Sequence, residues 1–176
     1  GTNSDDTLVG GSGADTLIGG GGADTITGGL GADFLLGGDG NDVFTYALSI
    51  ALVADASVDG GDGVDTISVD ASAGLLLLDS DFAKVTNMEN LVLTGTGGGN
   101  QVVFFGAMAS AAYTSGVTIT TDPLVSSLKL QGSAASVAIG VTGTDSSDTL
   151  IGGLANDSIS GGSGADTLPG GVGADT

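Results

Sequence analysis

Aspartate recurs at every ninth residue through both ends of this 176-residue chain. The first 45 residues divide into five units of nine, from GTNSDDTLV to GGDGNDVFT, and further units begin at Gly60 and Gly143. A carboxylate at a constant place in a glycine-rich turn offers oxygen ligands for a hard cation, together with backbone carbonyls. The sixth position of every unit is Asp, namely Asp6, Asp15, Asp24, Asp33, Asp42, Asp65, Asp148, Asp157, Asp166 and Asp175.

Calcium is the cation that this pattern favours. It takes about six to eight oxygen ligands, whereas magnesium demands a smaller octahedral site and retains its waters. The eighth position is apolar in every complete unit, as at Leu8 and Phe44. One such side chain contributes about 1.5 to 3 kcal/mol when buried, which cannot offset an ordering cost of about 1 to 2 kcal/mol per residue. We therefore expect several bound Ca²⁺ ions to stabilise the fold.

Short strands and turns, rather than helices, must position the aspartates. Glycines at the first, second and usually the fourth position would each cost a helix about 1 kcal/mol, but they permit the positive φ angles of a tight turn. Each unit is predicted to be a six-residue turn followed by a three-residue strand with one inward side chain. Pro169 is expected to remove a strand donor. Ser4, Ser146 and Ala155 replace the fourth-position glycine, where a positive φ would be strained.

The composition excludes several functions. Twenty-one acidic residues stand against two lysines, a net charge of −19, so the chain cannot present the basic face that nucleic acids or anionic membranes require. Without histidine or cysteine it cannot form a Ser-His or Cys-His nucleophile pair, nor an imidazole or thiolate metal site. No apolar stretch reaches the roughly 20 residues of a membrane span. Glu89 is predicted to be structural, because no motif ties a second carboxylate to it. We expect that the chain is not an enzyme.

The units resemble the GGxGxDxUx nonapeptide of RTX proteins, a secreted calcium-binding repeat family in which U is a large apolar residue. The resemblance implies an all-β fold, a parallel β-roll or β-solenoid with two nonapeptides per turn and calcium between the turns. It implies ligands from units two apart, which pairs Asp6 with Asp24, Asp15 with Asp33, Asp24 with Asp42, Asp148 with Asp166 and Asp157 with Asp175. The implied carbonyl ligands belong to Gly10, Gly19, Gly28, Gly37, Gly152, Gly161 and Gly170.

The sequence divides into four segments. Residues 1–45 are predicted to be an RTX β-roll, and 46–68 a spacer, with a loop-out or short helix over 46–59, plus one further unit. Residues 69–142 lack nonapeptides and carry short apolar or β-branched runs, which predict either a continued solenoid or a small β-sandwich. Residues 143–176 are a second RTX block that stops within a unit. The chain opens directly into repeat sequence, so we expect a mature segment or an excised piece.

The resemblance implies an extracellular, secreted or cell-surface structural module of a surface layer, adhesin or self-assembling matrix filament. NMENLVLTG resembles a strand that follows calcium units in surface-layer and adhesin-type RTX proteins. Such a module would fold on binding calcium after type I secretion. Residues 143–176 restart the scheme of 1–34, so we also expect head-to-tail self-association into a filament or lattice, without nucleic acid or membrane insertion. The alternative is the C-terminal calcium-binding or secretion region of a type I-secreted hydrolase or toxin, with its catalytic domain outside this chain.

Overall fold

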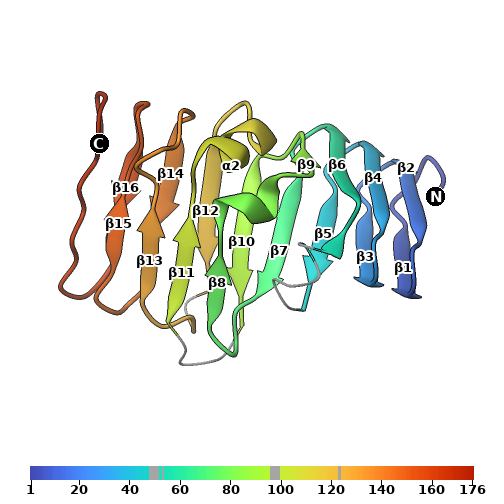
Figure 1. The fold of residues 1–176 in the computed structure, drawn as a ribbon, viewed down its shortest axis with the longest axis horizontal. Helices are drawn as coiled ribbons and strands as arrows, with labels where there is room; N and C mark the ends of the chain where they lie inside the picture. The colour runs from blue at the N-terminus through green and yellow to red at the C-terminus, as the bar shows by residue number, and fades with distance from the viewer. Residues whose placement is uncertain (48–51, 53, 96–99, 123) are drawn as a thin grey trace.

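The computed structural model describes residues 1–47, 52, 54–95, 100–122 and 124–176, which wind into a solenoid of parallel strands (Figure 1). Most coils cross an eight-stranded sheet, sheet A, and then one of two four-stranded sheets, sheet B in the N-terminal part or sheet C in the C-terminal part, and the coil of residues 66–86 crosses all three. The strand pairs are parallel throughout. The predicted all-β parallel solenoid is therefore confirmed.

The three sheets have the following strands. Sheet A contains β1 (Thr7–Ser12), β3 (Thr25–Leu30), β5 (Val43–Tyr46), β7 (Thr66–Asp70), β10 (Asn90–Thr94), β12 (Val117–Thr121), β14 (Ile139–Thr142) and β16 (Ser158–Ser160). Sheet B contains β2 (Thr16–Gly21), β4 (Phe34–Asp39), β6 (Ser57–Asp62) and β9 (Val85–Thr86). Sheet C contains β8 (Leu75–Leu77), β11 (Gln101–Phe104), β13 (Leu128–Gln131) and β15 (Thr149–Ile151).

The eighth-position side chains stack along the core in the predicted way. Leu8 lies opposite Ile26, Ile26 opposite Phe44, and Phe44 opposite Ile67, so one inward row continues from coil to coil. Ile26, Phe44 and Ile67 are fully buried. The repeat thus sets the register, because a slip by one residue would turn each strand's apolar side chains to the solvent.

The strands are longer and the turns shorter than predicted. β1 continues through the glycines of the next unit to Ser12, which leaves residues 13–15 as the turn before β2. The glycines extend the strand because they pair with the neighbouring coil, as Gly11 does with Gly29. Gly11 has φ of 113°, a conformation in which glycine meets no steric penalty.

Three substitutions of the fourth-position glycine cause no backbone strain, contrary to expectation. Among the described residues Asn87 is the only non-glycine residue with a positive φ, so Ser4, Ser146 and Ala155 avoid that region. Pro169 behaves as expected of a residue without an N–H. No strand forms around it, and the last coil contributes only an isolated bridge between Thr149 and Thr167.

Residues 69–142 continue the solenoid, rather than forming a sandwich. β7, β10, β12 and β14 are consecutive parallel neighbours in sheet A. Each middle strand buries two side chains on the core face instead of one, such as Leu91 and Leu93 of β10. The middle coils therefore enclose a thicker core than the glycine-rich coils do.

A short helical layer covers one side of the middle coils. It consists of the 3-10 helix η1 (Asp79–Phe82) and α2 (Ala107–Ala112), which lie together at the edge of the solenoid (Figure 1). Beneath them Phe82, Phe105 and Tyr113 form a buried aromatic cluster with ring centroids 5.4 to 5.9 Å apart. This cluster provides apolar burial that the nonapeptide pattern does not supply.

The predicted loop-out or short helix over 46–59 lies partly outside the described residues, which omit 48–51 and 53. The described part is more regular than expected, because β5 includes Tyr46 and β6 begins at Ser57, with Val58 opposite Leu35. Sheet A has strands on both sides of each predicted segment boundary. The division into four segments stays a prediction.

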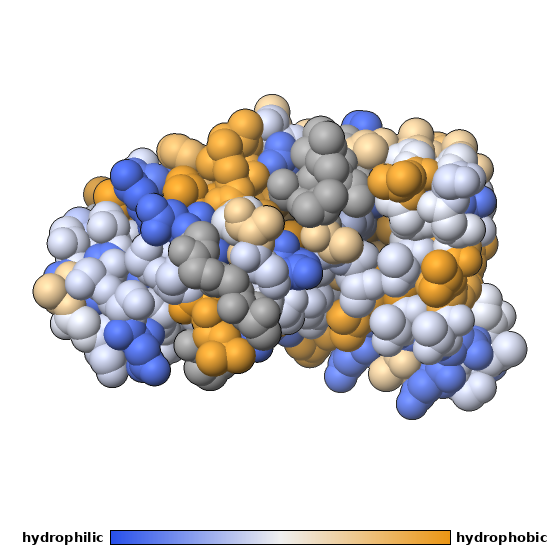
Figure 2. Space-filling model, turned by 90° about the horizontal axis from the view of Figure 1, so that it is seen from below, coloured by the Kyte–Doolittle hydropathy of each residue, from blue (hydrophilic) through white to orange (hydrophobic). Residues whose placement is uncertain are grey.

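The surface carries scattered apolar patches between polar residues, as Figure 2 shows from below. Ile18, Phe34 and Leu36 are exposed on the outer face of sheet B and line a shallow groove of about 280 Å³. No helix within the described part of the chain is long and apolar enough to cross a membrane.

Candidate metal sites

The aspartates lie in turns along the edges of the solenoid. Asp6, Asp24, Asp42 and Asp65 precede strands of sheet A, and Asp15 and Asp33 precede strands of sheet B. Because neighbouring strands of one sheet lie roughly 4.7 to 4.9 Å apart, aspartates from consecutive coils stack beside each other. In the second block Asp148 precedes β15 and Asp157 precedes β16, while Asp166 and Asp175 occupy the next coil.

One oxygen of each stacked carboxylate binds the backbone of the preceding coil. The N–H of Asp6 donates to Oδ1 of Asp24 at 2.7 Å, and the N–H of Asp15 donates to Oδ1 of Asp33 at 2.8 Å. The same bond joins Asp24 to Asp42, Asp42 to Asp65, Asp148 to Asp166 and Asp157 to Asp175. The structure therefore brings together every aspartate pair that the sequence predicted.

The other oxygen of the N-terminal aspartates is buried and unsatisfied. Oδ2 of Asp15, Asp24, Asp33, Asp42 and Asp65 has no hydrogen-bond partner among the residues that the structure describes. A buried ionised oxygen without a partner is costly, and it is rare unless it binds an ion or ordered water. This oxygen is the free ligand that a cation site requires.

Each unsatisfied oxygen points at a space that only a first-position glycine leaves open. A methyl group at Gly10 would lie 2.7 Å from Asp15 Oδ2 and 2.5 Å from the carbonyl oxygen of Gly28, one coil further on. Gly19 shows the same arrangement with Asp24 Oδ2 and the Gly37 carbonyl. We call such a space, lined by a carboxylate oxygen and a carbonyl oxygen of the next coil, a cradle. Its oxygen donors fit a hard divalent cation.

The cradles contain most, but not all, of the carbonyl oxygens that the sequence predicted. The carbonyls of Gly19, Gly28, Gly37, Gly161 and Gly170 line a cradle in the preceding coil. Gly10 and Gly152 were also predicted to supply carbonyl ligands, but the structure shows only the open space beside the α-carbon of each. The carbonyl of Gly60, which the sequence did not predict, lines the cradle of Gly37. Metal coordination by the predicted residues stays a prediction, taken up below.

The second block is arranged differently around its carboxylates. Oδ2 of Asp148 accepts a hydrogen bond of 2.6 Å from the N–H of Thr144, and Oδ2 of Asp157 accepts one of 2.5 Å from Gly153. The cradles of Gly143 and Gly152 still contain a next-coil carbonyl. A cation there would share Oδ2 with a turn N–H or displace it.

Burial and the crowding of like charges raise the pKa values of two cradle aspartates, Asp42 and Asp65. Burial raises the pKa of Asp65 to about 6, and the nearby charges of Asp42, Glu89 and Asp59 add to this effect. The pKa of Asp42 is raised by burial as well. Asp6 differs, because the N–H and hydroxyl of Thr2 donate to its carboxylate and lower its pKa. A cation in the buried cradles would favour the ionised carboxylates.

Two further acidic residues extend the stacked rows, namely Asp55, which the sequence interpretation missed, and Glu89, which it predicted to be structural. Asp55 is buried in the coil after Asp33, and its Oδ2 accepts a 2.8 Å hydrogen bond from the Tyr46 hydroxyl. Glu89 accepts a 2.7 Å hydrogen bond through Oε2 from the N–H of Asp65. Glu89 therefore takes the place that the next aspartate holds elsewhere. Glu89 precedes the core residue Leu91 by two positions, as each aspartate precedes its eighth-position residue, and that spacing was the available signal.

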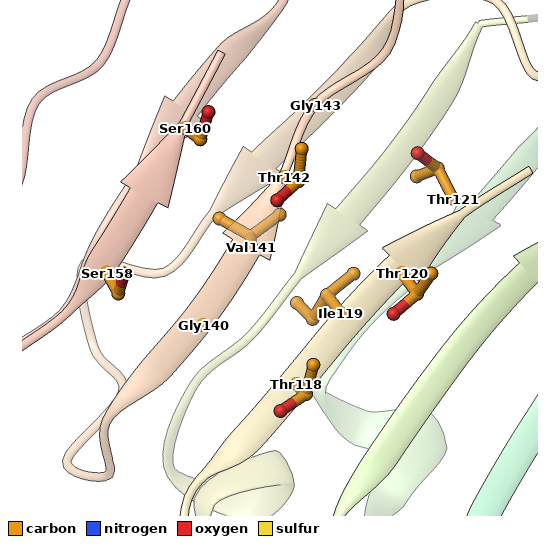
Figure 3. A pocket seen from close by; sticks show the side chains of 10 residues that line it. All are labelled: Thr118, Ile119, Thr120, Thr121, Gly140, Val141, Thr142, Gly143, Ser158 and Ser160. Atoms are coloured by element: carbon orange, nitrogen blue, oxygen red, sulfur yellow. The ribbon is translucent and has the colours of Figure 1, made fainter. Parts of the chain in front are cut away.

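No group of three or more acidic side chains within the described ranges lies close enough to hold one metal ion. Each cradle therefore depends on backbone oxygens for much of a coordination shell. A separate hollow of about 390 Å³ on the outer face of sheet A is lined by hydroxyl, methyl and backbone groups of β12, β14 and β16, among them Gly140 (Figure 3). None of these groups titrates near neutral pH, so this hollow supplies no general acid or base.

Comparison with known families identifies the repeats. A family model described as the RTX calcium-binding nonapeptide repeat matches in four copies, over residues 1–35, 18–46 and 142–176. Comparisons with curated proteins and with solved structures found no match.

Proposed function

Since the chain carries RTX calcium-binding nonapeptide repeats near both ends, and such repeats bind Ca²⁺, we propose that it is a structural module of a secreted protein that folds when calcium fills its cradles. The observation that carries this proposal is the row of buried Oδ2 atoms at Asp15, Asp24, Asp33, Asp42 and Asp65 that have no hydrogen-bond partner among the described residues. With a carbonyl oxygen of the next coil, those of Asp15, Asp24, Asp42 and Asp65 each line a site that a Cβ would fill.

The proposed ligands follow from this geometry. In the sheet B row, Asp15 Oδ2 and the Gly28 carbonyl would hold one ion; in the sheet A row, Asp24 Oδ2 and the Gly37 carbonyl would hold another. Asp42 with Gly60 continues the sheet A row. In the second block, Asp148 with the Gly161 carbonyl, and Asp157 with the Gly170 carbonyl, form the corresponding pairs. Bound Ca²⁺ supplies the positive charge that the chain itself lacks.

Coupling of folding to calcium follows from the charge. At −19 the chain repels itself, and folding packs carboxylates into stacked rows. A ligand that binds the folded chain and not the unfolded one converts its binding free energy into folding free energy. The chain would therefore stay unfolded where calcium is scarce and fold where calcium is plentiful.

Circular dichroism tests this proposal directly. The β-sheet signal and the melting temperature should rise with added CaCl₂ and fall again when EGTA removes the ion. Equal MgCl₂ should have a weaker effect, because the smaller ion demands octahedral geometry. A spectrum and melting temperature that ignore both calcium and the chelator would refute the proposed coupling.

We further propose that the module belongs to an extracellular surface layer, adhesin or matrix filament. RTX repeats are typical of secreted proteins, and residues 143–176 restart the scheme of residues 1–34. Coils of equal design can stack, which supports head-to-tail association into a filament or lattice. Electron microscopy with and without calcium tests this assembly. Monomers under both conditions would exclude it.

A second candidate is the calcium-binding region of a type I-secreted hydrolase or toxin. With no histidine and no cysteine, the chain cannot form a Ser-His or Cys-His nucleophile pair, so a hydrolase or toxin that uses such a pair would carry it in another part of a longer protein. The full gene sequence distinguishes the candidates. Catalytic motifs upstream would favour the hydrolase or toxin. Further copies of the scheme that residues 1–34 and 143–176 share would favour the structural module.

A further inference from the structure

We propose that the turn formed by residues 87–89 completes an additional calcium site with Gly60 and Asp65, outside the matched nonapeptide repeats. This inference rests on the proposed function, because it extends the same row of cradles by one coil. The family model matches residues 1–46 and 142–176, so neither side of this site lies within a matched repeat.

Asp65 supplies the unsatisfied ligand. Its side chain is fully buried and its Oδ1 accepts a hydrogen bond of 2.8 Å from the N–H of Asp42, while its Oδ2 has no hydrogen-bond partner within the described part of the chain. This is the arrangement of Asp24 and Asp42 within the repeats. A buried carboxylate oxygen is therefore left free here as well, next to a coil that contains no nonapeptide.

The following coil provides the carbonyl oxygen that closes the cradle. Pairing of β6 with β9 places Val58 opposite Val85 and Asp59 opposite Thr86, which brings Asn87 beside Gly60. A methyl group at Gly60 would lie 2.5 Å from Asp65 Oδ2 and would also meet the carbonyl oxygen of Asn87. Asn87 thus takes the place of a first-position glycine.

The backbone at Asn87 is held in an unusual conformation. Among the described residues it is the only non-glycine residue with a positive φ, at 54°. Asparagine tolerates this left-handed region better than most residues do. Its side-chain amide donates a 2.8 Å hydrogen bond to Oδ1 of Asp59, which fixes the turn. A strained turn held in place beside an unsatisfied carboxylate is consistent with a binding role.

Glu89 supplies the second carboxylate. The turn from Asn87 to Glu89 is three residues shorter than the turn from Gly60 to Asp65, and the longer glutamate side chain still brings Oε2 to 2.7 Å from the N–H of Asp65. A purely structural Glu89 would account for that hydrogen bond. It would not account for the partnerless Asp65 Oδ2 or for the carbonyl oxygen of Asn87 facing it. Carboxylate and carbonyl oxygens together are the donor set that calcium prefers.

Calcium stoichiometry in the Glu89→Gln variant tests the inference. Glutamine keeps the size of the side chain and an acceptor for the N–H of Asp65, but it removes the charge. Isothermal titration calorimetry and equilibrium dialysis with CaCl₂ should show the loss of one bound equivalent, with the calcium-saturated circular dichroism spectrum unchanged. Asp62→Asn is the matched control, because Asp62 is exposed at the end of β6; it should leave the stoichiometry unchanged. Unchanged binding by Glu89→Gln would overturn the proposal.

A measurement on the unmodified chain covers the case in which Glu89→Gln does not fold. Crystals of the wild-type chain grown with Tb³⁺ in place of Ca²⁺ should show an anomalous peak between Gly60, Asp65, Asn87 and Glu89. Peaks in the repeat cradles with none at this position would refute the additional site and leave the proposed function intact. No binding of either ion anywhere would refute the proposed function itself.

Discussion

The hydroxyl of Tyr46 donates a hydrogen bond of 2.8 Å to Oδ2 of Asp55, and both side chains are buried. Tyr46 belongs to β5 in sheet A, whereas Asp55 lies just before β6 in sheet B, so the bond ties together the two sides of one coil. This hydrogen bond thereby fixes the Asp55 carboxylate in the coil where the nine-residue spacing is interrupted.

Replacing Tyr46 by phenylalanine should destabilise the chain by about 1 to 3 kcal/mol, because Asp55 Oδ2 would remain buried without this donor. Tyr113→Phe is the matched control. Tyr113 is also buried, but its hydroxyl has no hydrogen-bond partner among the described residues, so its removal should cost nothing or stabilise slightly. Urea denaturation at saturating calcium measures both. Equal losses in the two variants would contradict the assigned role of the Tyr46 hydroxyl.

The calcium-free chain should become less stable as the pH rises. Burial raises the pKa of Asp55 and of Asp65 from 3.8 to about 6. A carboxyl group with a higher pKa in the folded chain stabilises folding fully below about pH 3.8, and this contribution is lost as the pH rises through about 6. The folded fraction in metal-free buffer, read from the β-sheet circular dichroism signal, should therefore be smaller at neutral pH than at about pH 5.

Bound calcium should reverse this loss of stability with rising pH. Binding requires the ionised carboxylates, so the affinity of the chain for calcium rises over the same pH range. Melting curves at fixed calcium and increasing pH measure this. The Asp55→Asn variant should show a flatter pH dependence without metal. A calcium-free folded fraction that increases with pH would show that burial does not control these groups.

Gly19→Ala should abolish one cradle. The new methyl group would lie 2.6 Å from the Gly37 carbonyl oxygen and closer still to Asp24 Oδ2, so it would occupy the space proposed for the ion. We expect a loss of calcium binding and a destabilisation of about 1 to 3 kcal/mol in calcium. Gly140→Ala is the control, since its methyl group would have no heavy atom closer than 3.7 Å. Calcium titration with calorimetry compares the two variants, and equal binding by both would argue against the cradle.

Asp79→Ala should loosen the helical layer without changing calcium binding. Asp79 Oδ1 accepts hydrogen bonds of 2.9 Å from the N–H groups of Gly106 and Ala109 at the start of α2, and Oδ2 accepts one from Met108. Loss of such a cap costs about 0.5 to 2 kcal/mol. Thermal melting and calcium titration should separate the two effects. A changed calcium stoichiometry would show that the layer and the cradles are coupled.

The sequence predicts the solenoid well wherever the period is constant. Leu8, Ile26 and Phe44 recur at a spacing of 18, and only in-register stacking buries all of them. The same spacing predicts which aspartates meet, as in the pair of Asp24 and Asp42. The family resemblance adds the identity of the ion.

The sequence predicts less where coils change length. Asp55 lies three positions before its core residue Val58 rather than two. A search for aspartate at the sixth position of a glycine-led unit therefore does not find it. Glu89 keeps the spacing to Leu91 but follows a shortened turn without glycine. The helix α2 depends on contacts with η1 and on the cap from Asp79, 27 residues or more away in sequence. Such long-range contacts leave no local pattern to predict from.

The strands run across the long axis of the molecule, and the two termini lie at its opposite ends (Figure 1). Tension applied between the ends would load the hydrogen bonds of one coil at a time, as in peeling, rather than shearing all of them together. Each released 18-residue coil adds about 60 Å of contour length. With calcium bridging consecutive coils, the ion would set the force at which each coil detaches. A tether of this design would lengthen in steps and absorb mechanical work before it breaks.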